Sequence, residues 1–199
     1  MNTRTIHGEQ CRTIFFVGKP GSGKGTQAKI LSETTGWRVI SAGEQFRAIA
    51  EEDTLFGQKV KSEMSAGHLV PHWLVIYLYI RALFSLSDGE SVIFDGFSRK
   101  VPEVEIVRDS HAWLGRVFTV FDIKISDEEV QKRLARRKEI EGRADDTVID
   151  ERLKEYYEYT GPAIEKFRDT GMLVEINGER PPEKIAADIC EALGIPLKD

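Results

Sequence analysis

A glycine-rich segment near the N-terminus constrains the fold of this chain more than any other feature. The segment GKPGSGKGT, residues 18–26, follows an apolar run at residues 13–17 and opens a stretch with helical spacing that begins near Lys24. In such a turn consecutive backbone N–H groups can point at one phosphate, and the helix N-terminus adds positive potential. Lys24 would reach the outer phosphates. A glycine-rich turn without a ligand is the alternative, but the flanking strand and helix favour a phosphate-binding loop.

Strand-like runs alternate with longer segments of helical spacing along the whole chain. The predicted strands are residues 13–17, 38–40, 91–94, 116–125 and 173–176. The predicted helices are residues 24–35, 43–52, 56–66, 71–85, 101–112, 127–138, 148–168 and 182–193. Such alternation predicts an α/β fold, with a parallel sheet covered by helices on both faces.

Composition favours one soluble globular domain without a metal or disulfide framework. The 199 residues include 28 Lys and Arg against 33 Asp and Glu, and 41% are hydrophobic. Cys11 and Cys190 are far apart, so neither zinc nor a disulfide is expected. The longest apolar run, residues 73–86, is interrupted by Arg81 and too short to span a membrane. With no signal peptide and a net acidic chain, we expect a cytoplasmic protein that binds neither membranes nor nucleic acid.

Five ordered segments resemble one family. GKPGSGKGTQ closely resembles the P-loop of the adenylate kinase and UMP/CMP kinase family, in which glycine is the normal residue after the lysine. The other four segments are SAGEQFR at 41–47, GHLVP at 67–71, FDGFSR at 94–99, and RLARR with GRADD and a later RL within 133–153. The resemblance therefore covers nearly the whole chain. It implies a P-loop NTPase fold with a five-stranded parallel sheet, a core of residues 1–40, 71–138 and 148–199, an acceptor-binding insert at 41–70 and a short lid at 139–147.

The resemblance also implies an activity. A nucleoside monophosphate kinase transfers the γ-phosphoryl group of ATP, carried with Mg²⁺, reversibly to a nucleoside monophosphate. The general resemblance favours AMP as the acceptor, with UMP, CMP and GMP as alternatives. A catalytically silent nucleotide-binding module is the alternative from another class, and it is disfavoured because the lysine, aspartate and arginines of the site are all present. We expect a monomer, and a lid without zinc because it contains no cysteine.

Six arginines at predicted element ends or loops are candidates for binding phosphate, namely Arg47, Arg99, Arg133, Arg137, Arg143 and Arg152. A guanidinium group stays charged and binds phosphate oxygens in pairs, although any one arginine could simply be a solvated surface residue. The resemblance implies that Arg47 and Arg99 hold the acceptor phosphate. It implies that Arg137, Arg143 and Arg152 surround the transferring group, and that Arg133 stacks on the ATP adenine.

The remaining site residues follow from the same resemblance. Asp95 ends a predicted strand, where a turn former is the alternative, and would orient Mg²⁺-bound water, with Thr26 as a second candidate for the metal. Asp145 and Asp146 would cap a helix and contact the lid. The catalytic set is Lys24, Asp95, Arg99, Arg137, Arg143 and Arg152. The ATP-binding set is Gly21, Ser22, Gly23, Lys24, Gly25, Thr26, Arg133, Arg137 and Arg180. The acceptor-binding set is Ala42, Arg47, His68, Val70, Gly96, Arg99, Glu103, Arg143 and Arg152.

The positions that would read the acceptor base depart from the family pattern. Ala42, Lys100 and Glu103 stand where adenylate kinases usually have Thr, Thr and Gln, and Ser98 replaces a proline. An ionised Glu103 can only accept hydrogen bonds, whereas adenine needs both a donor and an acceptor. Lys100 could supply the donor. The alternative is that Lys100 and Glu103 form an exposed pair on the helix.

Overall fold

A five-stranded parallel sheet forms the centre of the computed structural model, which describes residues 12–141 and 148–196. The strands are β1 (Arg12–Val17), β2 (Arg38–Ser41), β3 (Val92–Asp95), β4 (Val117–Lys124) and β5 (Leu173–Asn177). Their order in the sheet is β2-β3-β1-β4-β5, and every adjacent pair is parallel. The prediction of a five-stranded parallel sheet is confirmed.

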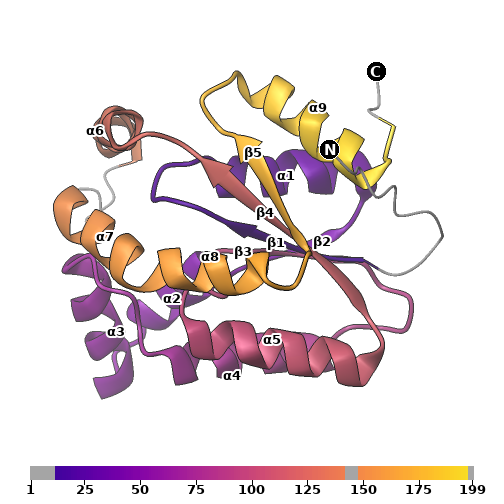
Figure 1. Ribbon diagram of the computed structural model, residues 1–199. Helices are drawn as coiled ribbons and strands as arrows, with labels where there is room; N and C mark the ends of the chain where they lie inside the picture. The colour runs from indigo at the N-terminus through magenta and orange to yellow at the C-terminus, as the bar shows by residue number, and fades with distance from the viewer. Residues whose placement is uncertain (1–11, 142–147, 197–199) are drawn as a thin grey trace.

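Helices cover both faces of the sheet (Figure 1). On one face lie α1 (Lys24–Thr35) and α9 (Pro182–Leu193), and on the other lie α4 (His72–Phe84), α5 (Val101–Leu114) and α8 (Gly161–Arg168). Because successive side chains of a strand point to opposite faces, Phe15 packs in the core under α4 and α5 while Phe16 packs under α1 and α9. Both rings are fully buried, which explains why β1 is apolar throughout.

The other helices lie towards one end of the sheet, where the strands finish (Figure 1). Between β2 and α4 the chain forms α2 (Ala42–Ala50) and α3 (Leu55–Ser65) with no strand, as predicted. After β4 come α6 (Asp127–Glu141) and α7 (Ile149–Glu155). Parallel strands direct their carboxyl ends to the same edge, and the loops and helices at that edge are where such folds bind ligands.

One predicted helix is interrupted. Residues 148–168 were expected to be continuous, but a π-helical segment, η2 (Tyr156–Thr160), separates α7 from α8. The Gly161 N–H donates to the Tyr156 carbonyl, five residues earlier. Pro162 has no N–H and cannot make the ordinary helical bond to the residue four positions before it, so a wider turn accommodates it.

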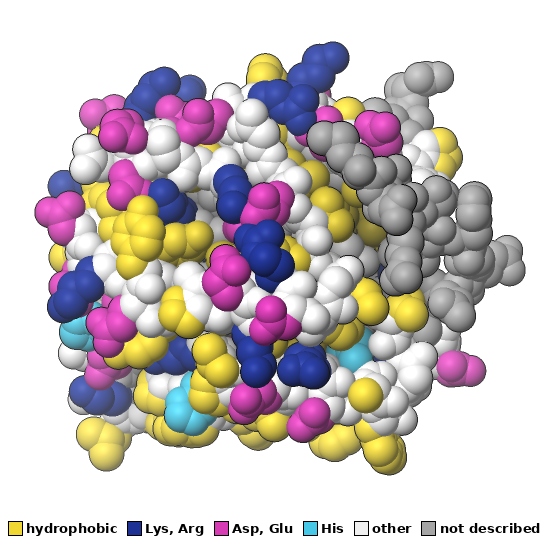
Figure 2. Space-filling model, viewed as in Figure 1, with side chains coloured by type: hydrophobic (Ala, Val, Ile, Leu, Met, Phe, Trp, Pro, Cys, Tyr) yellow, Lys and Arg dark blue, Asp and Glu magenta, His cyan; other side chains and the backbone are white. Residues whose placement is uncertain are grey.

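Several predictions fall on residues that the structure does not describe. Most of the expected lid lies there, with Arg143, Asp145 and Asp146, and so does Cys11. Cys190 is a buried free thiol. None of the helices in the described ranges has the length and apolar character needed to cross a membrane. Basic and acidic side chains are intermingled over the face of the molecule in Figure 2.

Candidate active site

A cavity of about 760 Å³ opens at the carboxyl edge of the sheet. This volume is typical of sites for small molecules. It is bounded by the loop after β1, the end of β3, helices α2 and α3, and the side chains of α6, α7 and η2. The predicted site residues that line it are Gly21, Gly23, Lys24, Gly25, Thr26, Ala42, Arg47, His68, Val70, Asp95, Gly96, Arg99, Glu103, Arg133, Arg137 and Arg152.

The loop between β1 and α1 has the backbone of a phosphate-binding turn. Gly18 has a φ of 132°, and a Cβ there would lie 2.5 Å from the Ile123 carbonyl oxygen, so only glycine fits. Gly23, with a φ of 97°, is the N-cap of α1 and offers no side chain to cap its first turn. The residues of that turn line the cavity and no side chain caps their N–H groups, which leaves them available to an anion. Ser22, within this loop, is fully buried and is not among the residues that line the cavity.

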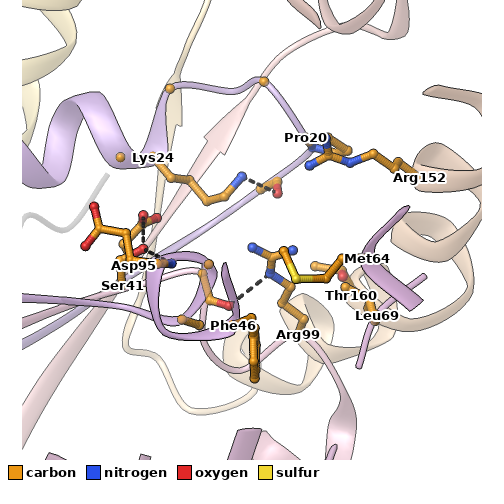
Figure 3. Close-up of a pocket in the computed structure, with 18 of the residues that line it drawn as sticks. Pro20, Lys24, Ser41, Phe46, Met64, Leu69, Asp95, Arg99, Arg152 and Thr160 are labelled. Atoms are coloured by element: carbon orange, nitrogen blue, oxygen red, sulfur yellow. Dashed lines mark hydrogen bonds between the residues drawn. The ribbon is translucent and has the colours of Figure 1, made fainter. Parts of the chain in front are cut away.

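Lys24 folds back across this loop. Its Nζ donates to the Gly18 carbonyl at 2.9 Å and to the Lys19 carbonyl at 2.7 Å. Loss of hydration, followed by the nearby Arg99 guanidinium, lowers the pKa of Lys24 to about 7, while the Asp95 carboxylate opposes the shift. A polyphosphate among these cations would raise the pKa again. Figure 3 shows Lys24 and Arg99 extending into the same space.

Asp95 and Ser41 meet at the ends of neighbouring strands. They are partners in the β2–β3 register, and the Ser41 hydroxyl donates to Asp95 Oδ2 at 3.3 Å (Figure 3). A Cβ on Gly25 would lie 3.4 Å from the same oxygen, so the P-loop passes close to this carboxylate. Among the described residues no cluster of three acidic, histidine or cysteine side chains could hold a metal alone. One carboxylate in a cavity that Thr26 also lines fits Mg²⁺ that arrives on a nucleotide and keeps most of its waters.

Arg99 is held by the turn that follows β3. Its Nε donates to the Gly96 carbonyl at 3.0 Å, and a Cβ on Gly96 would lie 2.6 Å from the guanidinium. The backbone N–H of Arg99 donates to Glu103 Oε2 at 2.7 Å. Ser98, directly before Arg99, has a φ of 60°, the one positive φ among the described non-glycine residues. The side chain of Arg99 is thus directed by a constrained backbone.

From the sequence, Glu103 was expected either to be ionised beside the acceptor base or to form an exposed pair with Lys100, and the structure differs from both expectations. The residue is only 4% exposed, so the hypothesis of an exposed pair with Lys100 is wrong. Lys100 points elsewhere, with Nζ 3.4 Å from the Leu69 carbonyl oxygen and 4.7 Å from the centre of the Tyr159 ring. Burial raises the pKa of Glu103 to about 7, against the hydrogen bond from Arg99 N–H. The carboxyl group is therefore not held in the ionised state assumed from the sequence.

The remaining arginines come mainly from α6 and α7. Arg133 forms an ion pair with Glu129 at 2.7 Å and donates to the Gly178 carbonyl at 2.8 Å, which holds it beside the P-loop. Arg137 follows one turn later on α6, and Arg152 on α7 points towards Pro20 (Figure 3). Arg180 does not line the cavity and instead forms an ion pair with Asp188 on α9.

Sequence reasoning missed part of the lining. Tyr156 and Thr160 enter the cavity through η2, which has no periodic signal in the sequence. The apolar residues Phe46, Met64, Leu69 and Val75 also line it. Phe46 stands next to Arg47 in the segment at 41–47, so that motif could have indicated it.

An ion pair between the P-loop and α6, formed by residues that are not among the cavity lining, was also missed. Lys19, in the P-loop, forms an ion pair with Asp127 at 2.5 Å, and the Tyr157 hydroxyl donates to the same carboxylate at 2.8 Å. The hydrogen bond from Lys19 lowers the pKa of Asp127. These contacts connect the P-loop to α6 and η2, but no local pattern in the sequence indicates which acidic residue Lys19 would contact.

The strand order, the loop after β1 and the cationic cavity define a P-loop nucleoside monophosphate kinase. The family model described as "Adenylate kinase" matches residues 16–172. The chain belongs to the adenylate kinase family.

Curated relatives support this assignment over nearly their whole length. The chain is similar to proteins named adenylate kinase from Bacteroides thetaiotaomicron, at 36% identity over 90% of this chain and 97% of the relative. It is also similar to the protein of that name from Maricaulis maris, at 37% identity over 90% of this chain and 97% of the relative. For the Thermus thermophilus protein the identity is 35%, over 92% of this chain and 98% of the relative.

Proposed function

We propose that this protein transfers the γ-phosphoryl group of ATP reversibly to AMP and so interconverts ATP plus AMP with two ADP. The observation that carries the proposal is one cavity with two sources of positive charge. The P-loop with Lys24 lies on one side and Arg99, in the turn after β3, lies on the other, while Arg152 on α7 points towards Pro20 of the P-loop. Two polyanions facing each other need such an arrangement. The curated relatives named adenylate kinase support the choice of substrates.

The two substrates would occupy different parts of the cavity. The β- and γ-phosphates of ATP would bind the P-loop N–H groups and Lys24, with the adenine against Arg133. The acceptor phosphate would bind Arg47 and Arg99. Residues 41–70, which contain α2 and α3, would serve as the acceptor-binding insert. The lid at 139–147 stays a prediction from the sequence, as do a monomeric state and a cytoplasmic location.

The reaction needs alignment and charge stabilisation rather than a general base. The attacking phosphate oxygen of AMP is already ionised at neutral pH. Lys24, Arg99, Arg137 and Arg152 would hold donor and acceptor in line and stabilise the charge on the transferring group. Mg²⁺ bound with ATP supplies further neutralisation, and Asp95 with Thr26 would hold its waters. Closure of the acceptor-binding insert and the predicted lid over the cavity would exclude water, which is the competing nucleophile.

The test is a coupled assay of ADP formation from ATP with AMP, UMP, CMP and GMP in turn. Highest kcat/KM with AMP is the expected result. Highest kcat/KM with another monophosphate would replace AMP as the acceptor. Lack of ADP with all four, from protein that still binds ATP, would favour the alternative of a silent nucleotide-binding module.

A further inference from the structure

An apolar compartment of the cavity contains one buried carboxyl group. Phe46, Val70 and Val75 line the cavity and belong to the same apolar cluster, and Met64 packs against that cluster. In Figure 3 the side chains of Phe46, Met64 and Leu69 gather around Arg99, away from Asp95. Glu103 also lines the cavity, and together with Val75 and Tyr79 it lines a second, smaller pocket. A flat apolar group such as a nucleobase fits this compartment, and Glu103 is the acidic side chain beside it at the start of α5.

The hydrogen bond to Arg99 distinguishes the two oxygens of this carboxyl group. Oε2 accepts the Arg99 backbone N–H at 2.7 Å. An amide hydrogen can only be donated, so Oε2 remains an acceptor whether or not the carboxyl group carries a proton. This hydrogen bond therefore favours Oε1 as the oxygen that carries the proton of the neutral group. The neutral group then offers one donor and one acceptor, and the ionised group offers acceptors only.

We propose that Glu103 reads the acceptor base through this proton, so that the neutral carboxyl group selects adenine and the ionised carboxylate selects guanine. The inference rests on the proposed function. Adenine presents an acceptor at N1 beside its donor amino group, which matches an O–H and a carbonyl oxygen. Guanine presents two donors at N1 and N2, which match a carboxylate. The family-typical amide could make only the first match with both of its groups.

The surroundings of Glu103 bring its titration close to neutral pH. Burial raises its pKa to about 7, while the backbone N–H groups and the charges of Arg99 and Lys100 oppose that rise. The other ionisable side chains near this part of the cavity are Tyr79 on α4, Arg47 on α2, His68 before α4, and Arg152 and Glu155 on α7. Below the pKa the carboxyl group is neutral and can donate to adenine. AMP binding then stabilises the neutral form, so binding near and above pH 7 should take up a proton.

The experiment measures AMP binding by calorimetry between about pH 6 and pH 8.5, without ATP or Mg²⁺. In the wild type we expect the Kd for AMP to rise about ten-fold across this range, equivalent to one neutral hydrogen bond, with proton uptake above pH 7. Glu103→Gln keeps an acceptor for Arg99 N–H and carries a permanent donor. Its Kd should stay low, apart from titration of the AMP phosphate, which is common to all variants. Glu105→Gln, at an exposed position on α5, is the matched control and should follow the wild type.

A second measurement compares base selectivity. The ratio of kcat/KM for GMP to that for AMP should rise about ten-fold with pH in the wild type and stay constant in Glu103→Gln. Identical pH dependences in the wild type and Glu103→Gln would overturn the inference and leave Glu103 as a structural helix cap. This failure differs from failure of the proposed function, in which ATP and AMP give no ADP at any pH.

Discussion

At the scale of single residues, charge placement and backbone strain determine what the site can do. Lys24 and Arg99 approach the cavity from opposite sides, yet each is held by carbonyl oxygens of its own turn. Both side chains are therefore oriented before a substrate binds. Preorganisation of this kind means that removing either charge should affect the transition state more than the fold.

Lys24→Ala and Arg99→Ala should each lower kcat by at least about 100-fold, because each removes a charge worth about 3 kcal/mol to the transition state. Steady-state kinetics would measure the loss, with unchanged circular dichroism as the test of folding. Lys184→Ala, at an exposed position on α9, is the control and should retain full activity. Normal turnover in folded Lys24→Ala protein would refute the proposed site.

Ser98 stores strain immediately before Arg99. Its φ of 60° lies in the left-handed region, which costs a residue with a Cβ about 1 kcal/mol or more. Ser98→Gly should therefore be more stable than Ser98→Ala by about 1 kcal/mol, although the entropy of glycine in the unfolded chain offsets part of the gain. Urea unfolding of the two variants measures the difference. Equal stabilities would show that this turn is not strained.

At the scale of elements, the local pattern of the sequence accounts for most of the fold. The bounds of α1 and α9 agree with prediction to the residue, because a glycine-rich loop and a C-cap glycine delimit α1 and two prolines with a glycine delimit α9. Contacts between distant segments were beyond local reasoning. The burial of Glu103 depends on the packing of α4 against α5, and η2 depends on how Pro162 is accommodated.

The α2–α3 segment should respond to occupation of both substrate positions. A bisubstrate analogue that joins two adenosines through a polyphosphate would engage Arg47 on α2 and the P-loop together, so it should favour a closed arrangement. Hydrogen exchange should then slow in residues 41–70 as well as at the start of α1. ATP alone is the control and should protect mainly the P-loop. Protection by the analogue confined to the P-loop would argue against an acceptor-binding insert.

At the scale of the whole molecule, two buried groups give stability opposite dependences on pH. Burial lowers the pKa of His111 to about 4, so the folded state binds fewer protons than the unfolded state below about pH 6.5, and stability falls as the solution is acidified. Burial raises the pKa of Glu103, so the folded state retains a proton that the unfolded state loses. Stability from this group is present at low pH and is lost between about pH 4.5 and pH 7.

Glu103→Gln should separate these effects. The variant lacks the titration of Glu103, so its free energy of unfolding should exceed that of the wild type by about 3 kcal/mol more at pH 7.5 than at pH 4.5. Urea unfolding at several pH values measures this difference, from which contributions of His111 common to both proteins cancel. Parallel pH profiles of the two proteins would show that Glu103 titrates normally.

The position of β1 in the middle of the sheet has a consequence for synthesis of the chain. Thr13 pairs with Val92 and Arg12 with Val117, so β1 acquires its neighbour β3 only after about 80 further residues have been added, and β4 only after about 105. Until then β1 lacks both neighbouring strands, and the unpaired strand is open to misassociation. The nascent chain cannot complete its P-loop early. We expect ATP to bind only after residue 124, the end of β4, has left the ribosome.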